Sequence, residues 1–280
     1  MSLELCVLAS GSSGNASLLR TPAGCLLIDA GIGPRTMAKR LDGTGCALAD
    51  IRAIVLTHLD RDHFSYSWLT TIVRRRIAVF VHHHRAEEVL GLCSDLNGLI
   101  HPFDRQTFSP LSGLEFTPLA LAHDSDGSHG FVMSGFGRRI GYATDLGRVP
   151  VHLLAAFEDL DILAIESNYD SQMQLTAERP YFLKQRIMGG SGHLSNAQAL
   201  AAVRQILDRA DSRRTPLPSS IVLLHRSRQC NCPKLLRQLF TSDARISPRL
   251  ILAEQYERTE WLRPSETRAR AGEQLVLAWG

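Results

Sequence analysis

The chain has 280 residues, 44% of them hydrophobic, and a formal net charge of +3. That length is enough to bury a substantial core, and the small charge permits an anionic partner without requiring one. No apolar run reaches the roughly 18 residues that a membrane helix needs, and the start lacks the features of a signal peptide. Together with six scattered cysteines, these features predict a cytoplasmic protein without a membrane partner.

Short runs rich in Val, Ile and Leu predict strands, and longer stretches between them predict helices. The predicted strands are residues 3–9, 16–20, 25–29, 53–57, 78–81, 114–122, 130–136, 139–143, 162–165, 221–224 and 250–253. The predicted helices are residues 34–41, 66–75, 85–92, 151–157, 197–210 and 233–240. This order indicates an α/β protein with two sheets packed together and helices outside them. We expect one domain over residues 1–280, with an Arg-rich C-terminal segment at about 262–280.

The segment most suggestive of chemistry follows the predicted strand 53–57, in the sequence THLDRDH at residues 57–63. It contains four candidate metal ligands, His58, Asp60, Asp62 and His63. Side chains in a loop can converge, because strand alternation no longer sends them to opposite faces. Histidine and carboxylate ligands suit zinc, manganese or iron. A polar surface loop is the alternative, and the histidines and aspartate later in the chain weaken it.

This segment resembles the H-x-H-x-D-H signature of the metallo-β-lactamase superfamily. Four further residues match in the family's order: Asp29 in LLIDAG, His123 in LALAHDSDGSHGF, Asp145 in RIGYATDLG and His225 in IVLLHRS. The resemblance spans residues 1–232. It implies the four-layer αββα sandwich of that superfamily.

Three shorter sequences resemble one branch, the YycJ/WalJ-like proteins: SGSSGN at residues 10–15, ESNYD at 166–170 and GHLSN at 192–196. This branch is similar to the nucleases RNase Z and RNase J. The resemblance therefore implies a phosphodiesterase or nuclease that cleaves DNA, or RNA, with a hydroxide activated by two metal ions.

The resemblance also implies which residues hold those ions. The first trio is His58, Asp60 and His123, the second is Asp62, His63 and His225, and Asp145 bridges the two ions. Asp62 would also orient the attacking hydroxide. Asp60 stands where the family has a histidine, so zinc is expected first, and the added carboxylate also suits manganese or iron.

His193 resembles the histidine of RNase Z that protonates the leaving oxygen, a role suited to a group that titrates near neutral pH. The alternative is a structural residue at the start of a helix that Ser195 or Asn196 caps. The candidate substrate-binding residues are Ser12, Ser13, Asn15 and Asn168. A plain turn explains the first three equally well, and a structural hydrogen bond explains the last.

Other interpretations stay open at this point. The same ions would also hydrolyse a small ester, thioester or lactone, and Asp60 also allows a non-catalytic nucleic-acid-binding protein with an impaired site. The candidate backbone-binding arginines are those at 74–76, 138, 139, 204, 209, 213 and 214. The run HHH at residues 82–84 favours a solvated turn or helix start. Oligomeric state is open, and a dimer is one option.

Overall fold

The computed structural model describes residues 3–264, and most of the predicted Arg-rich segment lies outside this range. The first sheet follows chain order: β1 (Glu4–Ala9), β2 (Ala16–Thr21), β3 (Gly24–Ile28), β4 (Ile51–Val55), β5 (Ala78–His82) and β6 (Ile100–Phe103). Its first three strands pair antiparallel, and the strands from β3 to β6 pair parallel.

The second sheet has the order β13-β12-β11-β10-β9-β8-β7. Its strands are β7 (Phe108–Leu111), β8 (Leu114–Leu121), β9 (Ser128–Gly135), β10 (Arg138–Ala143), β11 (Ile162–Glu166), β12 (Ser220–Leu224) and β13 (Leu250–Leu252). The strands from β10 to β13 are parallel. Their carboxyl ends therefore open at the same edge of the sheet.

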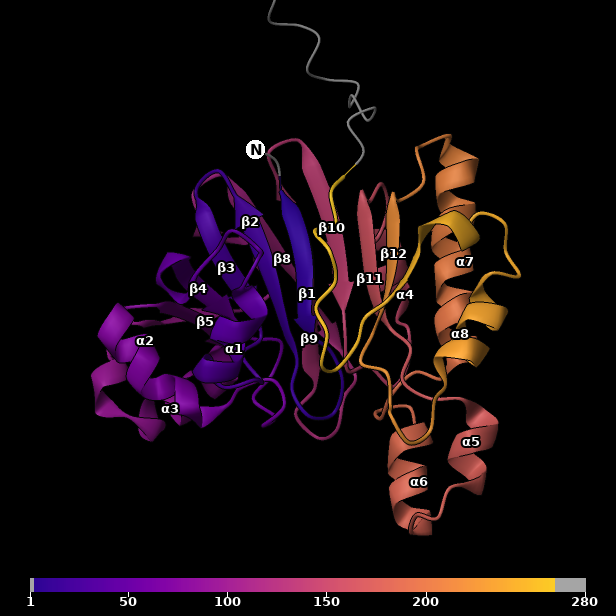
Figure 1. Cartoon of the computed structure of the whole chain (residues 1–280), viewed down its shortest axis with the longest axis horizontal. Helices are drawn as coiled ribbons and strands as arrows, with labels where there is room; N and C mark the ends of the chain where they lie inside the picture. Colours follow the sequence, from indigo (N-terminus) through magenta and orange to yellow (C-terminus); the bar gives the residue numbers. More distant parts are fainter. Residues whose placement is uncertain (1–2, 265–280) are drawn as a thin grey trace, which may run out of the picture.

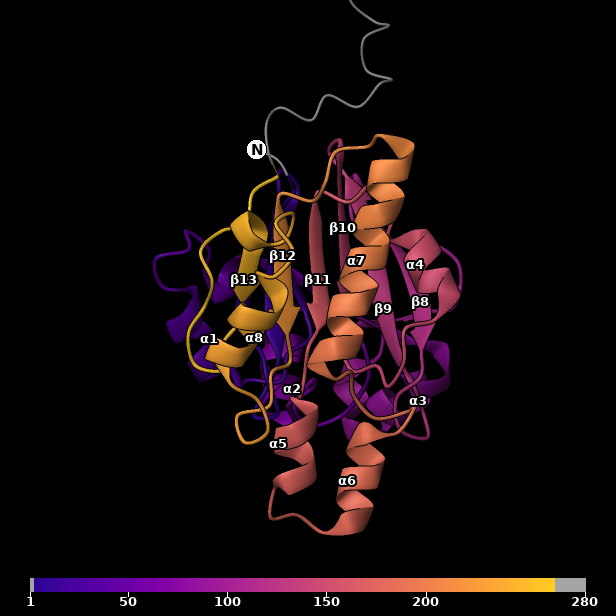
Figure 2. The same ribbon diagram turned by 90° about the vertical axis from the view of Figure 1, so that its right-hand side faces the viewer.

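Helices cover the outer face of each sheet (Figure 1). The first sheet carries α1 (Pro34–Leu41), α2 (Leu69–Arg75) and α3 (His83–Leu92), and the second carries α4 (Val151–Ala156), α7 (Asn196–Arg213) and α8 (Pro233–Phe240). The four layers confirm the predicted αββα fold class. Two helices, α5 (Ser171–Thr176) and α6 (Tyr181–Met188), project from one end of the sandwich (Figure 2). No helix in the described range is long and apolar enough to span a membrane.

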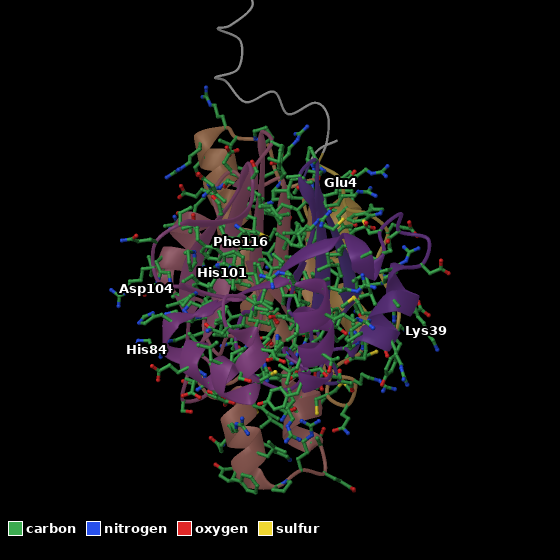
Figure 3. The ribbon with its side chains drawn as sticks, turned by 90° about the vertical axis from the view of Figure 1, so that its left-hand side faces the viewer. Glu4, Lys39, His84, His101, Asp104 and Phe116 are labelled. Atoms are coloured by element: carbon green, nitrogen blue, oxygen red, sulfur yellow. The ribbon has the colours of Figure 1, made fainter. Side chains whose placement is uncertain are left out.

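The core between the sheets contains side chains from both, including Leu26 and Val55 from the first and Phe116 and Phe131 from the second. Figure 3 shows Phe116 within the body of the protein and Lys39 and Asp104 at its edges. Most positions of the central strands are buried, because each sheet packs on the other sheet by one face and on helices by the other.

Every predicted strand and helix is present, but two strands and two α-helices of the described residues escaped prediction, as did short 3-10 helices. Strands β6 and β7 are short outer strands of their sheets and contain Pro102 and Pro110, which central strands do not tolerate. Helices α5 and α6 have almost no apolar face turned toward a core, and α6 has no buried residue at all. Without a buried stripe, the sequence has no helical periodicity to detect.

Candidate active site

The candidate site forms where strands of both sheets end. Asp29 follows β3, Asp145 comes two residues after β10, and His225 follows β12. These three residues have φ angles of 61°, 53° and 52°, in the left-handed region that residues other than glycine rarely adopt. Such backbone strain collects at functional sites, where the surrounding structure holds it in place. Here it turns each strand end sharply, so that Asp145 and His225 reach a shared space and Asp29 lies behind His63.

Two trios of candidate ligands meet in this space. In each trio the potential ligand atoms lie within 4.8 Å of one another; the trios are His58, Asp60 and His123, and Asp62, His63 and His225. Asp145 lies between them, with Oδ2 3.0 Å from His63 Nε2 and Oδ1 3.8 Å from His123 Nε2. The seven residues predicted to hold metal are therefore brought together, in the grouping that the sequence suggested.

Hydrogen bonds behind the histidines orient their rings. Nδ1 of His63 lies 2.7 Å from an oxygen of Asp29, and Nδ1 of His225 lies 3.0 Å from an oxygen of Glu166. Nδ1 of His123 donates to the Gly192 carbonyl at 3.0 Å, since a carbonyl only accepts. In each ring Nδ1 makes this bond and Nε2 points toward the shared space, which is the arrangement of histidines that bind metal.

His58 provides an independent test of whether a metal fits. Its Nε2 is buried and has no hydrogen-bond partner, a costly state for a polar atom. Burial lowers the pKa of His58 well below its usual value, and the neighbouring His63 lowers it further. His58 is therefore held in the neutral form that binds metal. The donor set, rich in imidazole and carboxylate, fits a pair of divalent ions.

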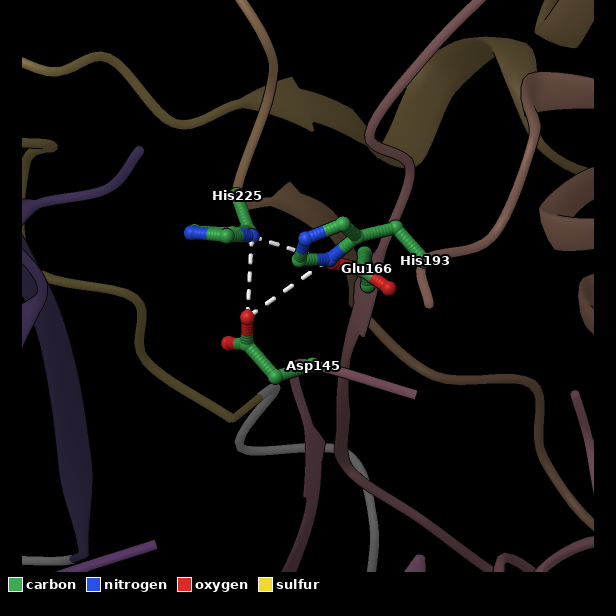
Figure 4. Close-up of side chains that lie close together, drawn as sticks. All are labelled: Asp145, Glu166, His193 and His225. Carbon is green, nitrogen blue, oxygen red and sulfur yellow. Dashed lines mark hydrogen bonds and ion pairs between the residues drawn. The ribbon is translucent and has the colours of Figure 1, made fainter. Parts of the chain in front are cut away.

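His193 lies beside these residues and bonds to the buried carboxylate of Glu166 (Figure 4). Its Nδ1 is 2.8 Å from Glu166 Oε1, and Glu166 also accepts from the Leu194 and Leu146 amides. Burial lowers the pKa of His193, but Glu166 and Asp145 outweigh it, so the pKa stands above its usual value. Glu166 therefore favours the charged form of the His193 imidazole at the edge of the candidate site.

Glu166 received no role in the sequence analysis, although it contacts both His193 and His225. It is fully buried at the end of β11, whose other residues are all apolar. A buried carboxylate must be paired, so a lone acidic residue closing an apolar strand was the signal that could have identified it.

The predicted substrate-binding residues separate into two groups. Ser12 is exposed and lines a pocket of about 220 Å³ together with His193 and five of the seven candidate ligands, and Ser13 is exposed beside it. Asn15 and Asn168 are buried, with their amide nitrogens 2.9 Å from His63 Nε2 and 2.7 Å from the His225 carbonyl. These two amides do not line the pocket, and their contacts orient ligands instead of a substrate.

The arginines expected to form one nucleic-acid surface do not do so. The arginines at 74–76 lie at the C-terminal end of α2, and those at 204–214 lie on α7 and at its end. These two helices are on opposite faces of the sandwich (Figure 1). Arg209 and Arg213 both pair with Glu158, and Arg204 pairs with Asp243. One surface that joins all of these arginines is therefore wrong, because α2 and α7 lie on opposite faces, and acidic neighbours pair with Arg204, Arg209 and Arg213.

Two of the structural alternatives are correct where they concern local structure. Ser195 caps α7, with its hydroxyl accepting from the Gln198 amide, as the alternative interpretation of the GHLSN sequence expected. His83 begins α3, as expected for the HHH run. The cap does not exclude a chemical role for His193, because the cap uses Ser195 and leaves the imidazole facing the pocket.

Comparison with known proteins agrees with this geometry. The profile of the beta-lactamase superfamily domain matches residues 25–214. The chain belongs to this family. Exodeoxyribonuclease YycJ of Bacillus anthracis is 25% identical over 242 residues, which cover 85% of this chain and 87% of that protein.

Exodeoxyribonuclease WalJ of Streptococcus pneumoniae serotype 2 is 25% identical over 234 residues, covering 82% of this chain and 83% of that protein. Among solved structures, the metallo-beta-lactamase fold protein YhfI of Bacillus subtilis superposes with a TM-score of 0.68 at 13% identity, covering 93% of this chain and all of that one. This likeness supports the fold of this family member.

Proposed function

We propose that this protein is a metal-dependent phosphodiesterase, a nuclease that cleaves DNA or RNA. The observation that carries the proposal is the pair of His/Asp trios around Asp145, beside His193 and its bond to Glu166. The relatives named as exodeoxyribonucleases support it, because the match covers most of both chains. DNA is accordingly the first substrate to test.

The two trios would each hold one divalent ion, with Asp145 between the ions. When bound, such a pair lowers the pKa of water and neutralises the charge that develops on a phosphodiester. Zinc is the first expectation because four histidines contribute to the trios. Asp60 replaces a fifth nitrogen donor with a carboxylate, which also suits manganese or iron.

The residues of this chain would divide the remaining work. The Ser12 hydroxyl donates to a phosphate oxygen at the mouth of the pocket. Asp62, which keeps one oxygen near His225 Nε2 at 3.4 Å, orients the attacking water with its other oxygen. His193 donates its Nε2 proton to the leaving oxygen, while Nδ1 stays bonded to Glu166.

The test is metal analysis combined with a substrate panel, applied to wild type, His58→Ala and His101→Ala. His101 lies on β6 and is exposed, so His101→Ala is a matched control outside the site. We expect about two ions per chain and metal-dependent cleavage of single-stranded DNA and of thymidine 5′-(p-nitrophenyl phosphate). His58→Ala should lose one ion and at least about a hundredfold in kcat, since it removes a ligand directly.

Other results would reject the proposal in distinct ways. Turnover of p-nitrophenyl acetate or a lactone without phosphodiester cleavage would favour the small-molecule hydrolase. Tight DNA binding with less than one ion and no turnover would favour the non-catalytic alternative.

We further propose that residues 1–280 form one cytoplasmic domain.

A further inference from the structure

Helix α6 forms a wall of the candidate active site although it packs against no core. Leu183, Arg186 and Ile187 line the same pocket as Asp62 and His193. Their spacing of three and four residues places them on one face of the helix. This face supplies the aliphatic side chains of a pocket that is otherwise lined by ligands, polar groups and a glycine.

Two aromatic residues at the start of α6 are almost equally exposed but point in different directions. Tyr181 and Phe182 are 75% and 72% exposed. At about 100° per residue, Phe182 is about 40° around the axis from Arg186 and about 100–140° from Leu183 and Ile187, whereas Tyr181 is about 120–160° from all three. Phe182 therefore lies at the Arg186 edge of the pocket-lining face, and Tyr181 lies on the opposite side of the helix.

The position of α6 is fixed relative to the candidate catalytic groups. The Ile187 carbonyl accepts from the His193 amide at 2.8 Å. Arg186 forms a two-contact ion pair with Asp124, the residue after His123, with Nε 2.9 Å from Oδ1. A Cβ on Gly192 would lie 2.2 Å from the carbonyls of Arg186 and Ile187, so the packing there tolerates only glycine. A molecule bound against α6 is thus held at a fixed position relative to His193.

We propose that this face of α6 is a nucleobase subsite for single-stranded DNA. Leu183 and Ile187 contact the sugar of the nucleotide next to the scissile phosphate, and Phe182 stacks on its base. Exposed aromatics beside a backbone-binding site are how proteins hold single strands without reading sequence, because every base has a stacking face. The occupant is a nucleotide chain, and not a protein, because the surface is continuous with the phosphodiesterase pocket. The inference rests on the proposed function.

The experiment compares Phe182→Ala with Tyr181→Ala as its matched control. Affinity for a fluorescent dT oligonucleotide is measured by anisotropy on the metal-loaded protein. The ratio of kcat/KM for thymidine 5′-(p-nitrophenyl phosphate) over methyl p-nitrophenyl phosphate is measured in parallel, because only the first has a base. We expect Phe182→Ala to raise the oligonucleotide Kd about tenfold and to reduce the ratio. Tyr181→Ala should change neither, and Phe182→Trp should restore both.

The outcomes separate this proposal from the proposed function. Cleavage of both esters with an oligonucleotide Kd that is the same in Phe182→Ala and wild type overturns the subsite and leaves the phosphodiesterase standing. Equal weakening by Tyr181→Ala and Phe182→Ala also overturns it, because the two sides of α6 would then be equivalent. Oligonucleotide binding that depends on Phe182, without hydrolysis of either ester, supports the subsite and rejects the proposed function. Thermal melting of each variant checks that folding is retained.

Discussion

Single residues decide the chemistry of this site through the groups behind them. Asp29 and Glu166 contact no pocket, yet they fix the ring orientation of His63 and His225. Glu166 has the larger set of partners on its two oxygens, which accept from two imidazoles and two backbone amides. A buried carboxylate with four donors is stabilised in its charged form, and burial, which opposes this, is outweighed: its pKa is lowered.

We therefore expect Glu166→Gln to reduce kcat by roughly 10–100-fold. The glutamine NH2 group is a hydrogen-bond donor, and it would face imidazole and amide groups that also donate. The pKa of His193 is raised in the folded protein against the effect of burial, with Glu166 as its main partner. Removing that charge lowers the pKa, so the loss of activity on the alkaline side should begin at lower pH. The pH profile of kcat measures this.

Glu158→Gln is the control for this substitution, because Glu158 pairs with Arg209 and Arg213 on the surface away from the site. Its profile should match that of wild type. An unshifted alkaline limb in Glu166→Gln would show that Glu166 does not set the protonation of His193.

At the scale of elements, the ligand loop after β4 is held by the chain that follows β3. The Ala30 amide donates to the His63 carbonyl at 2.7 Å, and the Asn15 amide donates to the Asp62 carbonyl at 2.6 Å. Gly31 lies between these bonds, and a Cβ there would be 1.8 Å from the Asp62 carbonyl oxygen. The segments around Asn15, Gly31 and Asp62 thus pack backbone against backbone, and position 31 has no room for a side chain.

Gly31→Ala should consequently destabilise the protein by about 2 kcal/mol or more, because the ligand loop must move to admit the methyl group. It should also reduce metal content, since Asp62 and His63 move with that loop. Chemical denaturation and metal analysis measure the two effects.

Gly91→Ala is the matched control, because Gly91 is in α3 and a Cβ there meets no atom within 4 Å. Helix propensity predicts that this change stabilises the protein by about 0.5–1 kcal/mol. Equal stability of the two variants would mean that the close contact at Gly31 relaxes without cost.

At the scale of the whole molecule, the site exists only because two sheets pack together. The first sheet positions Asp29 and the ligand loop, and the second positions His123, Asp145 and His225. The core between the sheets joins these halves, and Phe131 is fully buried in it. Loss of packing between the sheets should therefore affect stability and metal binding together.

We expect Phe131→Ala to lower the free energy of unfolding by about 3–5 kcal/mol, because it leaves a cavity between the sheets. Far-UV circular dichroism and metal release should report the same single transition, as one domain requires. Val151→Ala, at a position 75% exposed, should change stability by less than about 0.5 kcal/mol. Two separate transitions would contradict the single-domain proposal.

The sequence by itself determined the fold class and the identities of the seven candidate ligands, because strand patterns and short motifs are local properties of the chain. It also predicted His193 as the candidate general acid, and the structure places this residue in the pocket. Only the tertiary structure indicated what Glu166, Asn15 and Asn168 contact, because their histidine partners lie 27 or more residues away in the chain. It also separated the arginines, and it revealed α6, whose pocket-facing side has no periodicity because no core covers it.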